Sequence, residues 1–177
     1  MIQTLDQRAG FYKLLSVGFL FPDEQVAGLF HDWPAESLVA DYNRVFLGER
    51  AVPPYECEFL CRNEFERARH LADIAGFYRA FAVETRNERP DHISSELEFL
   101  HLLLSKEIEA RRQGNPENLE VTLDAERKFF REHLSTWAPA FISAVRRQAP
   151  PESPYAQLCG WLEALLEEEA ATLGEAS

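Results

Sequence analysis

Apolar residues recur at intervals of three and four along most of this chain, which is the spacing of one face of an α-helix. Near the N-terminus the pattern predicts a helix that begins at Leu5 and is stopped by Pro22, followed by a short helix from Asp23 to Phe30. Ser37 is expected to cap the next helix, because its side chain can accept an amide hydrogen bond there. No stretch alternates long enough to predict a sheet.

Proline pairs interrupt the helical pattern twice. Pro53-Pro54 excludes regular helix, because proline lacks an amide donor and biases the preceding residue to extended geometry. Residues 150–154 hold a second proline hinge. Between the two, helices are expected at 56–73, 74–81, 91–113, 119–134 and 141–148.

The helix at residues 91–113 has the widest apolar face, so we expect it to be central and buried from more than one side. Gly114 is its expected C-cap. A last helix carries Leu158, Leu162 and Leu165, and its end, 167–169, is a run of glutamates expected to face solvent. The pattern predicts an all-α fold, a helical bundle of about eight or nine helices forming a single domain over residues 1–177.

Charge narrows the possible partners. The chain has 177 residues, 30 acidic against 18 basic ones, and a formal net charge of -12. Such a surface repels nucleic acid and anionic membranes and attracts a cationic partner, although the same charge would also serve solubility alone. No apolar run approaches the length of a membrane span, and no cleavable leader is visible, so a cytoplasmic location is expected.

Motifs for catalysis are missing. The sequence has no dinucleotide fingerprint, no phosphate loop and no nucleophile elbow, so no catalytic residue and no cofactor is predicted. Glu98 and His101 form one E-x-x-H, whereas a di-iron bundle needs two. Cys57 and Cys61 are expected to be packed thiols, and no metal site is predicted.

The start of the central helix combines Pro90, Asp91, His92 and Glu96. One interpretation is helix initiation with Asp91 as the N-cap, in which His92 is neutral or paired with Asp91, because the helix dipole disfavours a cation there. The other is a polar cluster at the mouth of a buried helix that grips a peptide or a nucleotide group. The two interpretations are compatible.

A second segment invites two interpretations as well. It comprises residues 42–48, YNRVFLG, and residues 53–56, PPYE. It is either a structural corner with Tyr42 and Phe46 in the core, or the wall of a groove whose rigid aromatics offer contact area at low entropic cost.

Together these segments resemble a known family. Residues 42–48 with 53–56 are similar to the Y-x-x-L-F-x-G and P-P-[YW]-E-S block of the TorD/DmsD family of redox-enzyme maturation chaperones, and residues 89–100, RPDHISSELEFL, resemble its P-D-H-[IL]-x-x-E-L-E-F block. Order and spacing agree. Cys57 stands where the family commonly has serine.

The resemblance implies a TorD-like fold and a non-enzymatic function: binding the twin-arginine signal peptide and body of a molybdenum-cofactor oxidoreductase subunit until the cofactor is inserted. The family's Asp-His pair implicated in client binding matches Asp91 and His92. The opposite wall of one shared cleft would be formed by Tyr42, Phe46, Pro53, Pro54, Tyr55 and Glu56. Glu56, Asp91 and Glu96 are the candidate carboxylates for leader arginines.

Two alternative functions and the state of assembly stay open at this point. The chain could be a helical adaptor or scaffold with no molybdoenzyme client. It could be a weak nucleotide-binding protein, although no phosphate loop supports this. As to assembly, the proline hinges permit either a monomer or a homodimer that exchanges helices.

Overall fold

The computed structural model describes residues 4–28, 30, 33–84 and 89–174, and within them it is all-α, as predicted. Two short π-helical segments, η1 and η2, lie between α-helices. The elements in chain order are α1 (Leu5–Gly18), α2 (Glu24–Ala27), α3 (Ala35–Tyr42), η1 (Asn43–Leu47), α4 (Cys57–Leu60), α5 (Glu64–Ala80), α6 (Ile93–Gln113), α7 (Pro116–Phe129), η2 (Phe130–Leu134), α8 (Ser135–Gln148) and α9 (Pro154–Gly174).

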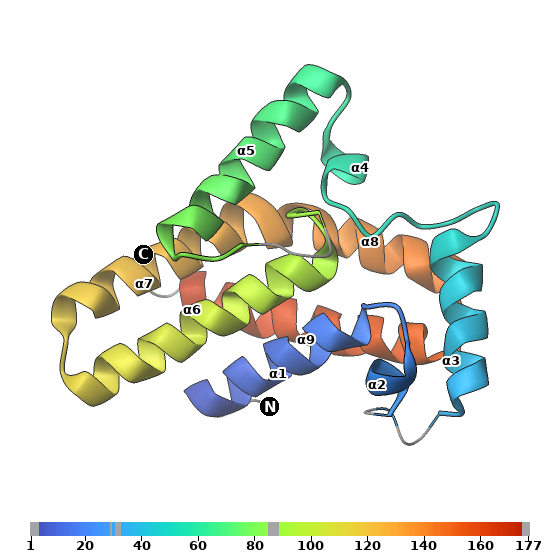
Figure 1. Ribbon diagram of the computed structural model, residues 1–177, viewed down its shortest axis with the longest axis horizontal. Coiled ribbons are helices and arrows are strands. Elements are labelled where there is room, and N and C mark those ends of the chain that lie inside the picture. The colour runs from blue at the N-terminus through green and yellow to red at the C-terminus, as the bar shows by residue number, and fades with distance from the viewer. Residues whose placement is uncertain (1–3, 29, 31–32, 85–88, 175–177) are drawn as a thin grey trace.

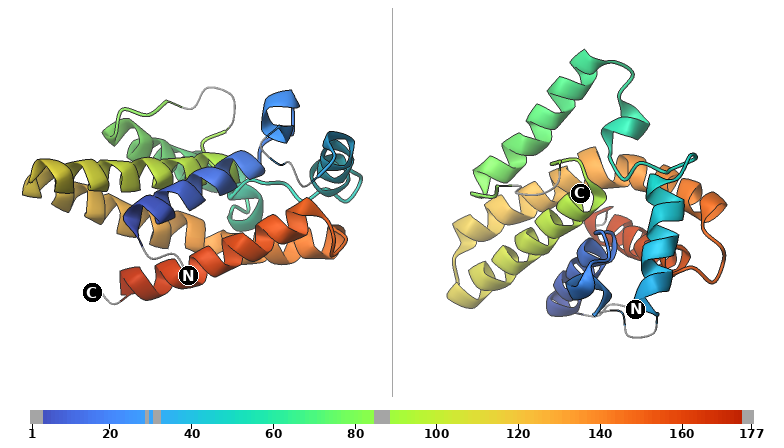
Figure 2. Two further views of the ribbon diagram at one scale, coloured as in Figure 1. Left: turned by 90° about the horizontal axis from the view of Figure 1, so that it is seen from below. Right: turned by 45° about the vertical axis from the view of Figure 1, so that its right-hand side comes forward.

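Helix α6 is the centre of the bundle, with α1 and α7 packed along it and α8 paired with α9 on the other side (Figures 1 and 2). Leu97, Leu100 and Leu104 are at most 1% exposed, which confirms the predicted central helix. Gly114 ends it in the left-handed conformation, with φ of 64°, as expected of a C-cap glycine. None of the described helices is long and apolar enough to cross a membrane.

Helix α5 differs from the other long helices because it projects from the bundle (Figure 1 and the right view of Figure 2). Along its 17 residues only Ile74 and Tyr78 are buried. The predicted boundaries were wrong here. The chain is extended at Cys61, so α4 ends and a new helix starts after the N-cap Asn63, whose side chain accepts from the Glu66 amide. The segment at 74–81 is the continuation of α5 rather than a separate helix.

Two further helix starts were predicted wrongly. Helix α3 follows Pro34 rather than Ser37, since proline suits a helix start that needs no amide donor. Helix α8 starts at Ser135, with Pro139 inside it, because the buried Trp137 and Ala138 hold this turn against the core.

The glutamate run near the C-terminus is not uniformly solvated, which corrects another prediction. Glu169 is 1% exposed and accepts two hydrogen bonds from the Arg8 guanidinium, at 2.8 and 2.6 Å. Arg8 also reaches Glu126 at 2.8 Å. This cluster ties α1 to α7 and α9.

Candidate functional site

The two sequence segments meet, as predicted. The Glu56 amide donates to the carbonyl of Asp91, and the Ile93 amide donates to the carbonyl of Pro54, both at 2.9 Å. Tyr55 and His92 therefore form an isolated antiparallel bridge, although no longer sheet follows among the described residues. The extended geometry that Pro53-Pro54 enforces leaves these backbone groups free to pair. The bridge fixes the chain before α4 against the start of α6.

Asp91 does not cap α6, contrary to one sequence interpretation. Its buried carboxylate accepts from Nε and Nη2 of Arg89, at 3.0 and 2.7 Å, and from the amide of Cys57 at 3.2 Å. The Arg89 guanidinium lies 4.3 Å from the centre of the Tyr55 ring. The Asp91 carboxylate thus joins Arg89 to the start of α4. The bidentate, charged pair with the guanidinium is the stronger of these contacts.

His92 is the N-cap of α6 instead. Its Nδ1 accepts a hydrogen bond from the Ser94 amide at 3.1 Å, and its ring packs edge-on against Tyr55 with centroids 5.1 Å apart. Burial lowers the pKa of His92 to about 4, with Asp91 opposing the shift. The imidazole is therefore neutral near pH 7, which confirms one of the two predicted states. An accepting Nδ1 requires the neutral form.

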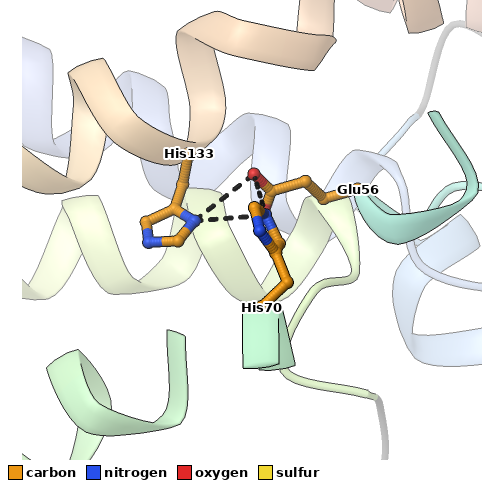
Figure 3. Close-up of side chains that lie close together, drawn as sticks. All are labelled: Glu56, His70 and His133. Carbon is orange, nitrogen blue, oxygen red and sulfur yellow. Dashed lines mark hydrogen bonds and ion pairs between the residues drawn. The ribbon is translucent and has the colours of Figure 1, made fainter. Parts of the chain in front are cut away.

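Glu56 points away from the corner, toward two histidines that come from distant segments (Figure 3). Its Oε1 lies 2.8 Å from Nε2 of His70 on α5, and its Oε2 lies 3.2 Å from Nδ1 of His133 on η2. Burial alone would raise the pKa of Glu56, but the two imidazoles outweigh it and lower that pKa. The neighbouring carboxylate in turn raises the pKa of His70.

Glu96 lies beside this group but carries no partner cation. Burial, reinforced by the charge of Glu56, raises the pKa of Glu96 well above its usual range. The Trp137 indole donates to its Oε2 at 3.0 Å. A protonated carboxyl is the form that a site with a second acidic group at close range favours.

An open cleft of about 800 Å³ lies between α4, α5 and η2, next to the histidines. His70 and Asp73 line it, together with Glu66, Arg69 and Glu132. Carboxylates outnumber cations on its walls, so the cleft suits a cationic occupant. It does not include Tyr55 or His92 among its lining residues.

The predicted site residues are mostly buried, and none of them lines the cleft between α4, α5 and η2. Tyr42 and Phe46 pack against Tyr155, with centroids 5.8 and 5.1 Å away, which confirms the structural-corner interpretation. Pro53 and Tyr55 are half-buried, whereas the rest are buried: Pro54, Glu56, Asp91, His92 and Glu96. Client binding by any of them stays a prediction.

Sequence reasoning missed His70 and His133. They lie far from Glu56 in the chain, and no metal-ligand spacing connects the three. The E-x-x-H motif that the sequence did show serves another purpose: Glu98 accepts from Lys13 at 2.7 Å, and His101 Nδ1 lies 2.8 Å from the Ala9 carbonyl. Both contacts fasten α1 to α6.

Comparison with known proteins gives a consistent result. Residues 22–143 match the family model described as nitrate reductase delta subunit. The chain is 35% identical over 146 residues to the selenate reductase assembly chaperone protein of Thauera selenatis, covering 79% of this chain and 72% of that protein. It is 34% identical to the chlorate reductase assembly chaperone protein of Ideonella dechloratans, with the same coverage.

More distant relatives agree. The chaperone protein TorD of Aliivibrio salmonicida is 28% identical over 109 residues, covering 59% of this chain and 49% of that one. The crystal structure of a putative redox enzyme maturation protein from Archaeoglobus fulgidus superposes with a TM-score of 0.56 at 24% identity, covering 90% of this chain and 91% of that one. That structural likeness supports the fold.

Proposed function

We propose, from the premise that this chain belongs to the TorD/DmsD family of redox-enzyme maturation chaperones, that it is a cytoplasmic chaperone for the catalytic subunit of a molybdenum-cofactor oxidoreductase. It binds the subunit's twin-arginine leader and its body, and it holds them until the cofactor has been inserted and export begins. Its relatives are named as assembly chaperones, so the family is one of binding proteins and not of enzymes.

The acidic cleft beside α5 is the observation that carries this proposal. A twin-arginine leader begins with positive charge and continues with an apolar stretch. Glu66, Asp73 and Glu132 give the cleft an excess of negative charge, and the whole chain carries a net charge of -12. Guanidinium groups pair with carboxylates in bidentate geometry, which gives direction as well as attraction.

Apolar side chains near the cleft suit the second part of a leader. Leu60 lines the cleft and is 37% exposed, and Phe65, on the first turn of α5, is 81% exposed. Large apolar side chains exposed together often mark a binding surface. An amphipathic leader segment would cover them as a helix lying in a groove.

In this proposal the predicted corner positions the cleft. The backbone bridge between Tyr55 and His92 holds the segment before α4, and Asp91 binds the first amide of α4. Because Arg89 already pairs with Asp91, a leader arginine would have to displace it to reach that carboxylate. Leader arginines therefore meet the cleft carboxylates first.

Calorimetry with a synthetic leader peptide tests the proposal. Glu66→Gln combined with Glu132→Gln should weaken binding about tenfold, because each lost pair at an exposed site contributes on the order of 0.5–1 kcal/mol. Glutamine at position 66 keeps the helix cap, since that position accepts Glu or Gln. The matched control is Glu117→Gln with Glu120→Gln, which removes two exposed charges from α7 and should leave affinity within about twofold.

Two further results decide the issue. Wild-type affinity should fall when both leader arginines are replaced by glutamine and when salt is raised. Equal affinity for the arginine and glutamine peptides would contradict the proposal. Co-purification of a molybdopterin-dependent subunit separates a maturation chaperone from an adaptor without such a client.

A further inference from the structure

Glu56, His70 and His133 come from three different elements, and one ligand atom of each lies within 4.8 Å of the others. Glu56 precedes α4, His70 is in the middle of α5, and His133 is in η2 (Figure 3). Glu56 is completely buried and His133 is 1% exposed, whereas the His70 side chain is 26% exposed. The cluster is thus enclosed on one side and opens through His70 to the cleft.

Two imidazole nitrogens and one carboxylate oxygen are a ligand set for zinc and related divalent ions. Bonds of about 2.0–2.1 Å in a tetrahedral arrangement put neighbouring ligand atoms about 3.3 Å apart. The observed separations from Glu56, 2.8 Å to His70 and 3.2 Å to His133, are close to that value. A small outward movement of His70, on the projecting helix, would make room for an ion.

The three side chains satisfy one another only in part. Nδ1 of His133 lies 3.2 Å from Oε2 of Glu56, whereas Nε2 of His70, 2.8 Å from Oε1, makes no aligned hydrogen bond. A buried carboxylate beside an imidazole without a hydrogen bond is costly unless something compensates it. A cation among them would use all three lone pairs.

A further contact supports the tautomer that metal binding needs. Oδ2 of Asp73 lies 3.4 Å from Nε2 of His133, on the far side of the ring from Glu56. Histidine ligands commonly present their second nitrogen to a carboxylate, which fixes the ring and strengthens the ligand. Asp73 is placed to hold the proton on Nε2 and leave Nδ1 free for a metal.

We propose that Glu56, His70 and His133 bind one divalent transition-metal ion of the zinc class, with an open coordination position on the side of the cleft. The ion would link α5 to η2 and to the chain before α4. It would thereby fix the helix that forms one wall of the cleft. This site is additional to the proposed chaperone function and does not depend on it.

The neighbouring thiols are the main competing ligands. Cys57 and Cys61 are one helical turn apart, and Cys61 lines the same cleft. Thiolates bind zinc strongly, so a metal held by sulfur has to be distinguished from one held by the Glu56 cluster. Cobalt makes that distinction, because cobalt–thiolate bonds give an intense near-ultraviolet charge-transfer band and nitrogen–oxygen sites give none.

Titration of the full chain with Co²⁺ after chelator treatment tests the proposal. We expect one equivalent to bind, with the visible absorption of a four- or five-coordinate ion and no thiolate band, and Zn²⁺ should displace it. His70→Gln should weaken cobalt binding at least tenfold. His101→Gln and Cys61→Ser are the matched controls, and both should bind as the wild type does.

His133→Gln should abolish binding as well. Should that buried substitution unfold the protein, as circular dichroism would show, the partly exposed His70→Gln still decides. Absence of stoichiometric binding, unchanged affinity in His70→Gln, or a thiolate band lost in Cys61→Ser would each overturn the metal site. The titration contains no peptide, so its failure leaves the chaperone proposal untouched.

Discussion

Two buried clusters of charge in this bundle neutralise their carboxylates in different ways. In the first, Arg8 reaches Glu126 and Glu169 at 2.8 and 2.6 Å, and those glutamates are only 2% and 1% exposed. In the second, Glu56 faces His70 and His133, and the cluster opens to the cleft. An arginine is always charged, whereas a histidine can lose its proton or bind a metal.

This difference suggests that the Arg8 cluster is structural, whereas the Glu56 cluster has the properties of a binding site. The Arg8 cluster joins α1, α7 and α9 through a guanidinium whose charge is constant. An arginine side chain has no lone pair with which to coordinate a metal ion. The Glu56 cluster uses two histidines, which can bind a metal ion, and one of them, His70, is on α5, the helix that projects from the bundle. We expect substitutions in the first cluster to change stability and those in the second to change binding.

The largest expected effect is in the arginine cluster. Arg8→Met leaves Glu126 and Glu169 buried without a cation, so the free energy of unfolding should fall by about 3–5 kcal/mol. Urea denaturation followed by circular dichroism measures this. The control is Lys13→Met, whose pair with Glu98 is 48% exposed on both sides and should cost less than about 1 kcal/mol. A similar loss in both variants would remove the distinction between buried and exposed pairs.

The next largest expected effect is a dependence of the free energy of unfolding on pH, caused by Glu126. Burial raises the pKa of Glu126 to about 7, with Arg8 opposing and Glu169 reinforcing the shift, from an ordinary value of 4.5. The folded protein therefore holds this proton more tightly than the unfolded chain. The contribution of Glu126 to stability consequently becomes more unfavourable as pH rises from 4.5 to 7.

Glu126→Gln removes that titration. Relative to the variant, the wild type should lose on the order of 2 kcal/mol of unfolding free energy between about pH 5 and about pH 7. Denaturant titrations at both pH values give the difference. Glu120→Gln, an exposed substitution on the same helix, should track the wild type. A difference between wild type and Glu126→Gln that does not change with pH would contradict the raised pKa.

The smallest effect is expected at Glu96. Burial raises the pKa of this carboxyl well above its usual range, which favours its neutral form. Glu96→Gln keeps the shape and an oxygen that accepts from the Trp137 indole, so unfolding free energy should change by less than about 1 kcal/mol. Thermal and urea unfolding at neutral pH measure it. A loss above about 2 kcal/mol would show that the charged form is required.

Much of the fold could be predicted because the apolar spacing is local information. The central helix, which runs from Ile93 to Gln113, and its Gly114 cap are both confirmed. The errors arose where a distant partner decides. The glutamate run at the end of α9 is typical of an exposed segment, yet Glu169 is buried because it pairs with Arg8, 161 residues away in the sequence. From the sequence, Asp91 is the expected N-cap of α6. Its carboxylate oxygens instead accept hydrogen bonds from Arg89 and the Cys57 amide, and His92 is the N-cap.

The same distinction between local patterns and distant contacts applies to the candidate site. Motif order was enough to predict that the segments of Tyr55 and His92 meet, and the backbone bridge confirms it. The burial of Glu56 and Glu96 could not be predicted, because their partners, His70, His133 and Trp137, come from distant parts of the chain. His70 and His133 carry no local signature, since only the packing of three elements brings them near one carboxylate.

The π-helical segment η2 accommodates one extra residue between α7 and α8. A π turn holds one residue more than an α turn, so deleting a single residue between Phe130 and Leu134 would restore ordinary α-helix while the flanking helices keep their buried faces. The residues left in the segment would take new positions around the turn, and His133 would lose its place beside Glu56. The bulge therefore presents a polar side chain to Glu56 without turning the apolar faces of α7 and α8 out of the core.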